Sequence, residues 1–167
     1  MPTEARPDIL FSRENLMKNT PITRKKMIRL LNEDLAREYQ AIIAYIVYSQ
    51  TMKGAQYLHI AGELEKHAAQ ELSHALLIAK QIDYFNGTPL LAPKTVKFSE
   101  KAADNLRFDL ENERTTILHY RQRIRQAEDM GEFGLSEILR RIIAEEQDHL
   151  TDLADALGID TPKIEVD

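Results

Sequence analysis

The stretch HAAQELSH, residues 67–74, ends in the pattern Glu-x-x-His, and the stretch EEQDH, residues 145–149, repeats that pattern 75 positions later. In a helix, residues three positions apart lie on one face, so both side chains of each pattern reach the same interior point. Carboxylate and imidazole groups together are typical ligands of a transition metal. The repeat therefore predicts two helices that contribute matching ligands to one shared site.

The same offset of 75 positions relates two more pairs of residues. One member of each pair lies upstream of the first Glu-x-x-His pattern, and the other lies upstream of the second. The matched residues are Glu38 and Glu113, Tyr45 and Tyr120, Glu71 and Glu146, and His74 and His149. Each lies within an apolar stripe of helical spacing; Glu38, for example, follows Leu31 and Leu35 and precedes Ile42. Such stripes face the core of a helix bundle, so we expect all eight side chains to lie in the interior.

The rest of the chain divides into four amphipathic segments separated by turns that contain Gly or Pro. We expect helices at residues 21–51, 57–85, 99–130 and 135–157. Thr20 and Ser99 are the predicted N-caps of the first and third helices, and Gly158 ends the fourth. Short connections predict two antiparallel hairpins, and the long segment 86–98 predicts a crossover between them.

The predicted fold class is therefore all-α, a four-helix bundle. Its expected parts are an N-terminal extension (1–20), the bundle (21–158) and a C-terminal tail (159–167). The tail is too short and too interrupted by Pro to form a useful fifth helix.

The composition supports this organisation and excludes several kinds of protein. The 167 residues include only six Gly and six Pro, and 29% are charged, as in long amphipathic helices. The absence of Cys excludes disulfides and thiolate metal sites, and we expect a cytoplasmic location. We find no apolar run that predicts a membrane span and no secretory signal. The net charge of −5 argues against DNA binding, despite the basic segment 24–26.

The carboxylates on the predicted core faces carry the argument for metal. Four Glu side chains in one apolar core would repel one another and lose their hydration, so the fold needs compensating positive charge. Two divalent cations cancel four carboxylates in formal charge, and this ligand mixture suits iron or manganese better than zinc. We therefore predict a two-metal site whose ligands are Glu38, Glu71, His74, Glu113, Glu146 and His149.

Four further residues are candidates for supporting this site. Tyr45 and Tyr120 are either core aromatics with satisfied hydroxyl groups, or hydrogen-bond donors to the opposite Glu, or electron donors. Gln70 and Glu145 each precede a Glu of the repeated pattern. They either orient the histidines or lie on a solvated helix face.

His67 breaks the internal repeat, because its counterpart at the same offset is Ile142. Two roles are open to it, a core histidine with satisfied nitrogens and an accessory iron ligand. We favour the first, since buried histidines of this kind are usually satisfied core residues.

Four segments together resemble the ferritin-like superfamily, and bacterioferritin above all. They are LNEDLAREYQAIIAY (31–45), HAAQELSH (67–74), DLENE (109–113) and EILRRIIAEEQDH (137–149). Such proteins place one Glu from each of two helices and Glu-x-x-His from each of the other two around a pair of metals. The resemblance implies a ferroxidase that oxidises Fe(II) with oxygen or hydrogen peroxide, stores Fe(III) and protects against oxidative stress.

The resemblance also implies individual roles for the six ligand residues. Glu38 and His74 would be terminal ligands of one iron ion, and Glu113 and His149 of the other. Glu71 and Glu146 would bridge both ions.

Two departures from bacterioferritin matter. That family binds haem through a Met directly after the second-helix Glu, where this chain has Leu72, so haem is not expected. The family's fifth helix is also missing, as in the twelve-subunit Dps cages. The chain therefore resembles a Dps-like mini-ferritin with a bacterioferritin-type centre inside each subunit.

The first predicted helix carries a second apolar stripe outside its core face. Its members are Ala36, Tyr39, Ile43, Ile46 and Val47, and their counterparts on the third helix are Glu111, Arg114, Leu118, Arg121 and Gln122. An apolar outer face predicts a partner surface. We expect a homodimer through this helix, as a building block of a dodecameric or other cage, although residues 1–20 could cover the stripe instead.

Two other functions compete with iron storage. One is a di-iron oxidase or peroxidase like rubrerythrin, although the chain lacks rubredoxin-type cysteines. The other is a bundle whose metal is purely structural.

Overall fold

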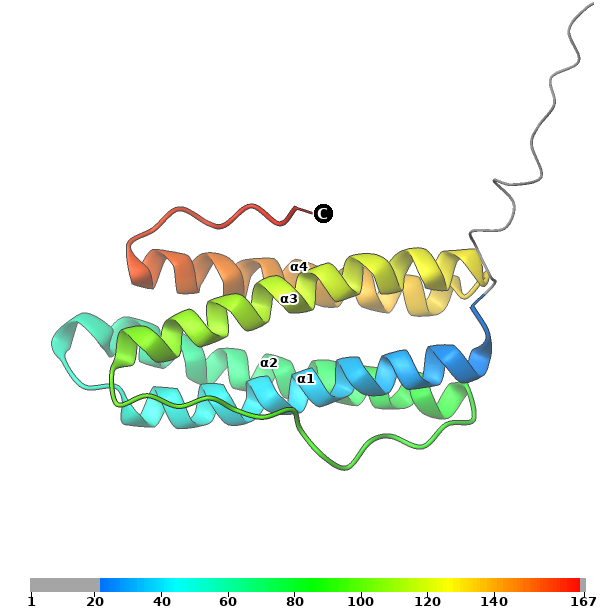
Figure 1. Cartoon of the computed structure of the whole chain (residues 1–167), viewed down its shortest axis with the longest axis horizontal. Coiled ribbons are helices and arrows are strands. Elements are labelled where there is room, and N and C mark those ends of the chain that lie inside the picture. The colour runs from blue at the N-terminus through cyan, green and yellow to red at the C-terminus, as the bar shows by residue number, and fades with distance from the viewer. Residues whose placement is uncertain (1–21, 166–167) are drawn as a thin grey trace, which may run out of the picture.

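The computed structural model describes residues 22–165, and it is all-α over that range (Figure 1). The helices are α1 (Arg24–Thr51), α2 (Leu58–Tyr84), α3 (Ala102–Asp129) and α4 (Phe133–Leu157), with a short 3-10 turn, η2 (Ala55–Tyr57), before α2. The predicted N-terminal extension and the predicted cap at Thr20 lie outside the described residues. None of the described helices is both long and apolar enough to cross a membrane.

The four helices form the predicted bundle of two antiparallel hairpins. In Figure 1, α1 and α2 form one hairpin, α3 and α4 the other, and the segment between α2 and α3 runs along the length of the bundle. Helix α1 packs on α2 and α3, and α4 packs on α3 and α2. The four-helix prediction is thus confirmed, and no fifth helix is present within residues 22–165.

Two predicted helix starts differ from the structure. α1 begins at Arg24, because the Thr23 side chain accepts a hydrogen bond of 3.2 Å from the Lys26 amide and caps the first turn there. Ser99 is not the N-cap of α3; that helix begins three residues later. The Ser99 hydroxyl instead accepts from the Lys101 amide at 3.1 Å, which organises the turn before the helix.

The other end of the second hairpin also needs a correction. The sequence predicts that the fourth helix begins at residue 135, but α4 begins at Phe133 and includes Gly134. Gly131 makes the turn before α4, and its φ of +73° is in the left-handed region that glycine adopts most readily. The predicted end of α4 at Gly158 is confirmed, since this residue is a left-handed C-cap with φ +67°.

The crossover is bound to one side of α1. Asn32 contacts it twice, accepting from the Leu90 amide at 2.6 Å and donating to the Thr88 carbonyl oxygen at 3.1 Å. One turn later the Lys94 amide donates to the Ala36 carbonyl oxygen at 3.0 Å. These contacts cover Ala36, which is buried, so its assignment to an exposed apolar stripe is wrong.

The C-terminal segment after α4 folds back beside the second hairpin (Figure 1). The Arg121 guanidinium on α3 donates a hydrogen bond of 2.7 Å to the carbonyl oxygen of Ile164. This segment therefore covers part of α3 without being helical.

The core has an apolar cluster at each end of the bundle and a polar layer between them. One cluster contains Leu31, Ile78 and Leu139, and the other contains Leu64, Leu106 and Leu153. The apolar ends supply the hydrophobic driving force for folding. The layer between them contains the residues that the repeat predicts as metal ligands.

Candidate metal centre

The structure brings all six predicted ligand residues together in the middle of the bundle. Glu38 comes from α1, Glu71 and His74 from α2, Glu113 from α3, and Glu146 and His149 from α4. Each is at most 3% exposed. Helical spacing of the stripes explains this arrangement, because each polar residue occupies a core position between aliphatic neighbours.

The first group of donor atoms surrounds His74. Its Nδ1 lies 3.4 Å from Glu38 Oε2, 3.3 Å from Glu71 Oε2 and 3.4 Å from Glu146 Oε1. Glu38, Glu71, His74 and Glu146 therefore offer four donor atoms within 4.8 Å of one another.

The second group surrounds His149 in the same manner. Its Nδ1 lies 2.9 Å from Glu71 Oε1, 3.2 Å from Glu146 Oε2 and 3.9 Å from Glu113 Oε1. Glu71 and Glu146 thus take part in both groups, and each directs a different carboxylate oxygen to each imidazole. The geometry is that of two adjacent groups of four potential ligands, which share two carboxylates.

Buried donor atoms without hydrogen-bond partners also indicate that these residues fit a pair of divalent cations. Glu38 Oε2, Glu71 Oε1, both oxygens of Glu146 and His149 Nδ1 are buried without a hydrogen-bond partner in the described part of the chain. A buried polar atom without a partner is costly. All of these atoms face the two groups just described, so cations bound there would satisfy them. Four carboxylates also match the charge of two divalent ions.

Without metal, protons balance part of the negative charge. Burial raises the pKa of Glu71 and of Glu113 well above the usual range, and the neighbouring carboxylates raise it further. Burial also acts to raise the pKa of Glu146, but the imidazoles of His149 and His74, which lie 3.2 Å and 3.4 Å from its oxygens, lower it to about 2. For these two imidazoles burial acts downward, yet the surrounding carboxylates raise both pKa values. The positive charge of protonated histidines therefore offsets part of the carboxylate charge when no cation is bound.

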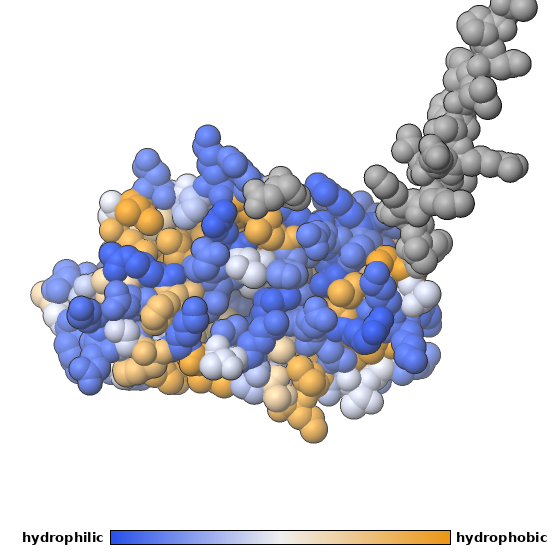
Figure 2. Space-filling view, in the orientation of Figure 1, coloured by the Kyte–Doolittle hydropathy of each residue, from blue (hydrophilic) through white to orange (hydrophobic). Residues whose placement is uncertain are grey.

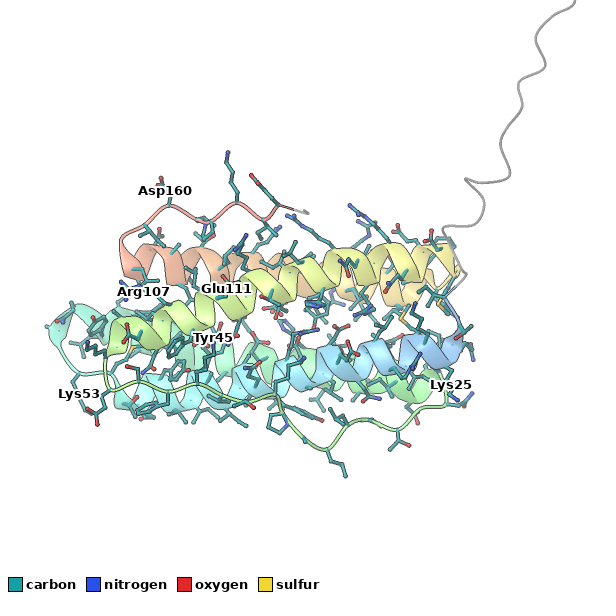
Figure 3. The ribbon with its side chains drawn as sticks, viewed as in Figure 1. Lys25, Tyr45, Lys53, Arg107, Glu111 and Asp160 are labelled. Carbon is teal, nitrogen blue, oxygen red and sulfur yellow. The ribbon has the colours of Figure 1, made fainter. Side chains whose placement is uncertain are left out.

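The two tyrosines bind carboxylates of the opposite hairpin. Tyr45 on α1 donates a hydrogen bond to Glu113 Oε1 on α3, and Tyr120 on α3 donates to Glu38 Oε1 on α1. Burial raises the pKa of both phenols, so they remain hydrogen-bond donors at neutral pH. Figure 3 shows Tyr45 between the helices.

Gln70 and Glu145 contact the far nitrogens of the two histidines. His149 Nε2 lies 2.9 Å from Gln70 Oε1, and His74 Nε2 lies 3.2 Å from Glu145 Oε2. In the neutral imidazole that binds a metal, such contacts hold the proton on Nε2 and leave the lone pair of Nδ1 directed at the centre.

One buried pair near the centre was not predicted. Arg123 on α3 donates to both oxygens of Asp34 on α1, from Nε at 2.7 Å and from a terminal nitrogen at 3.2 Å. The repeat marks Asp34 alone, which matches Asp109 at the offset of 75. Arg123, however, matches Tyr48, and the repeat therefore gave no reason to pair the two residues.

A cavity of about 180 Å³ gives access to the centre from the side of α1 and α3. The carboxylates of Glu38, Glu71, Glu113 and Glu146 line it, together with Arg37 and Lys94 among others. The centre is therefore buried but is reached through a polar opening.

Comparison with known proteins decides the family. A model of the ferritin-like domain matches residues 28–161. The chain belongs to the ferritin-like family. This ferritin-like chain is 28% identical over 127 residues to a bacterioferritin of Desulfovibrio desulfuricans, covering 75% of this chain and 71% of that protein.

Solved structures agree with this result. A ferritin-like, diiron-carboxylate protein from Bacillus anthracis str. Ames has a TM-score of 0.77 and 34% identity, with 80% of this chain and 96% of that chain covered. The dodecameric thioferritin of Bacteroides fragilis has a TM-score of 0.75 and 30% identity, with 82% and 87% covered. The ferritin-like fold and the bacterioferritin resemblance are therefore confirmed.

Proposed function

We propose that this ferritin-like protein is a ferroxidase that oxidises Fe(II) to Fe(III) within each subunit, for iron storage and detoxification. The observation that carries the proposal is the pair of four-ligand groups that share Glu71 and Glu146. Glu38 and His74 would complete one iron site, and Glu113 and His149 the other. Each Fe(II) ion, as substrate, gives one electron to oxygen or hydrogen peroxide.

The chain's own residues favour this reaction in two ways. The carboxylate charge at the centre stabilises Fe(III) more than Fe(II), because the attraction grows with the charge of the ion. The hydroxyl group of Tyr120 holds Glu38 Oε1 and leaves Glu38 Oε2 to face His74, and the hydroxyl group of Tyr45 holds Glu113 in place through Oε1. Gln70 and Glu145 would hold the histidines in the orientation that directs Nδ1 to the ions.

Removal of one terminal ligand at a time tests the site. We expect E38A and E113A to slow Fe(II) oxidation strongly in stopped-flow measurements, with helix content unchanged by circular dichroism. E111A is the matched control, because Glu111 is an exposed carboxylate on the same helix as Glu113. Unchanged kinetics in E38A or E113A would show that the ligand assignment is wrong.

Self-association is part of the proposal. Exposed aliphatic side chains lie on the outer faces of the first hairpin: Ile43 and Ile46 on α1 are 40% and 52% exposed, and Leu72 and Leu76 on α2 are 53% and 57% exposed. Figure 2 shows hydrophobic side chains along the edge of the molecule formed by the first hairpin and the crossover. We infer a homodimer through this surface and, by analogy with the dodecameric relative, a cage.

Sedimentation of a variant at this surface tests the assembly. I46R introduces the residue type that the second hairpin carries at the matching position, Arg121. We expect it to convert the assembly to smaller species, whereas L118R on α3 leaves the size unchanged. Equal sedimentation of I46R and the wild type would contradict the proposed interface.

Iron retention separates storage from other di-iron chemistry. Aerobic addition of Fe(II), followed by size exclusion, should give a large particle that holds far more than two iron ions per chain. Retention of two ions on a dimer-sized peak would instead support a rubrerythrin-like oxidase or peroxidase. The absence of haem, expected from Leu72, stays a prediction that a haem titration would check.

A further inference from the structure

Two cationic side chains border the cavity that leads to the centre from the side of α1 and α3. Arg37 on α1 and Lys94 on the crossover line this cavity of about 180 Å³ together with the four glutamates of the centre. Liquid water takes about 30 Å³ per molecule, so a cavity of this volume has room for a small polyatomic ion. Guanidinium and ammonium groups are the usual protein partners of phosphate and related oxyanions.

The positive charge of Arg37 has no counterpart in the internal repeat. The residue at the offset of 75 is Asn112, which is neutral and lines the same cavity. The next position along the repeat is a glutamate in both halves, Glu38 and Glu113. The candidate metal ligands therefore do not require a cation beside them, and the charge of Arg37 needs another explanation.

The protein leaves hydrogen-bonding capacity on the Arg37 guanidinium. The side chain is 11% exposed, and its ion-pair partner, Asp34 Oδ1, lies 3.9 Å from a terminal nitrogen, which is beyond hydrogen-bond distance. The Nε of Arg37 is buried and has no hydrogen-bond partner in the described part of the chain. Asp34 is instead engaged by Arg123, at 2.7 Å. A ligand that accepts from the Arg37 guanidinium would offset the cost of unpaired donors.

The second cation is anchored through the backbone. The Lys94 amide donates to the Ala36 carbonyl oxygen at 3.0 Å, which fixes the crossover on α1 directly before Arg37. From α3, Thr115 and Thr116 line the same cavity, and a hydroxyl group can donate to an oxyanion. Cations from one side and hydroxyl groups from the other therefore border one space.

Metal at the centre would decide the net charge of this cavity. Without metal, the four carboxylates that line it oppose the entry of an anion. Two divalent cations would balance those carboxylates in formal charge and leave the charge of Arg37 and Lys94 in excess. An anion should therefore bind after the metal ions, and by linkage it should strengthen their binding in turn.

The α2–α4 side of the centre is acidic by comparison. His67 is 3% exposed, stacks on His149 with ring centroids 4.0 Å apart, and places Nε2 3.1 Å from Asp152 Oδ2. Glu63 belongs to the same cluster. The Nδ1 of His67 has no hydrogen-bond partner among residues 22–165, so the prediction of a core histidine with both nitrogens satisfied is wrong. An anion would meet carboxylates on this side and cations at the α1–α3 opening.

We propose that Arg37 and Lys94 form a binding site for one small tetrahedral oxyanion of the phosphate type, which becomes competent when the di-metal centre is filled. The inference rests on the two-metal centre of the proposed function but not on the oxidation of iron. In a ferroxidase, the anion would balance the positive charge that each iron ion gains on oxidation.

Phosphate binding to protein loaded with Co²⁺ tests the site without any oxidation step. Full-length protein carrying two Co²⁺ ions per chain, freed of unbound metal, is dialysed anaerobically against phosphate. We expect one phosphate per chain, with an affinity about tenfold or more lower in the metal-free protein. Co²⁺ is paramagnetic, so the ³¹P resonance of bound phosphate should broaden, whereas diamagnetic Zn²⁺ in its place should not cause this broadening.

Three variants test the residues. R37N copies the neutral residue of the matching position, and K94Q removes the second cation from an exposed position of the crossover. Each should weaken phosphate binding about tenfold or more, with Co²⁺ stoichiometry and helix content unchanged, because a charge-assisted hydrogen bond is lost. R29N removes an exposed arginine earlier on α1 and is the matched control, which should bind phosphate as the wild type does.

The outcomes separate this inference from the proposed function. Wild-type phosphate affinity in both R37N and K94Q, or an affinity that Co²⁺ does not change, would overturn the site. Phosphate that binds without ³¹P broadening by Co²⁺ lies away from the centre and would overturn it as well. A protein that holds two Co²⁺ ions but no phosphate refutes this inference and leaves the ferroxidase standing. Phosphate bound as expected by a protein that does not oxidise Fe(II) would reject the ferroxidase and retain the site.

Discussion

The two hairpins of this ferritin-like chain present the same polar residues to the interior and different residues to the outside. Inside, Glu38 and Tyr45 on α1 match Glu113 and Tyr120 on α3, and each tyrosine binds the glutamate of the other hairpin. Outside, exposed Ile46 on α1 matches Arg121 on α3. Both halves supply the same types of candidate metal ligand, whereas the exposed side chains of Ile43, Ile46, Leu72 and Leu76 give the first half an apolar outer face.

The buried aspartates of the two hairpins differ in their partners. Asp34 on α1 is paired with the Arg123 guanidinium. Asp109, its counterpart on α3, has one oxygen without a partner in the described chain. Burial raises the pKa of Asp109 well above its usual range, although Asn112 acts to lower it. One position therefore holds an ion pair, and the other holds a carboxyl group that resists ionisation.

The largest expected effect comes from breaking the ion pair. D34A or R123A should each lower the free energy of unfolding by about 3–5 kcal/mol, because each leaves one buried charge unpaired. Urea denaturation at neutral pH measures this. The double variant D34A/R123A should lose less than the sum of the two, and strict additivity would contradict a direct pair.

The tyrosines test whether the two metal positions are equivalent. Y45F and Y120F should each weaken metal binding by about 10–100-fold, because each releases one carboxylate oxygen that the hydroxyl held. Co²⁺ titration of the two variants side by side gives the comparison. If one substitution has its full effect and the other none, the two metal positions are not equivalent.

Metal binding should also depend on pH with a defined sign. The pKa values of His74, His149, Glu71 and Glu113 are all raised, so these groups carry protons in the metal-free protein at pH values where they would ordinarily be free of them. Metal displaces these protons, so metal affinity should increase as pH rises, by about tenfold per pH unit for each proton released.

Calorimetry in buffers of different ionisation enthalpy counts these protons. H74A and H149A should each release fewer protons than the wild type, by similar numbers if the halves are equivalent. Metal affinity that is independent of pH would contradict the proton-balanced centre.

The smallest expected effect is at Asp109. Because its folded pKa is raised, Asp109 stabilises the fold most at low pH, and that contribution is lost as pH rises. D109N removes the charge, so its stability relative to the wild type should increase with pH, by an amount on the order of 1 kcal/mol. Urea denaturation of both proteins at pH 5 and pH 8 provides the test. If D109N is less stable than the wild type at pH 8, the charge of Asp109 has a favourable partner.

The sequence predicts the interior of this molecule better than its edges. Helical spacing places Glu71 and His74 on one core face, and that face determines the packing, so the convergence of the six residues follows. Helix starts depend instead on local hydrogen bonds such as those of Thr23 and Ser99, which several neighbouring residues could have made. The ion pair of Arg123 joins two hairpins, and it follows from their docking rather than from any local pattern.

Each four-ligand group draws its carboxylates from both hairpins: the group around His74 includes Glu146, and the group around His149 includes Glu71. The hairpins are formed by contacts close in sequence and can assemble quickly, whereas their docking has to close the long crossover first. Bound metal would therefore act on the last step of folding. It should slow the separation of the hairpins and leave their formation unchanged, so that loaded protein persists longer without folding faster.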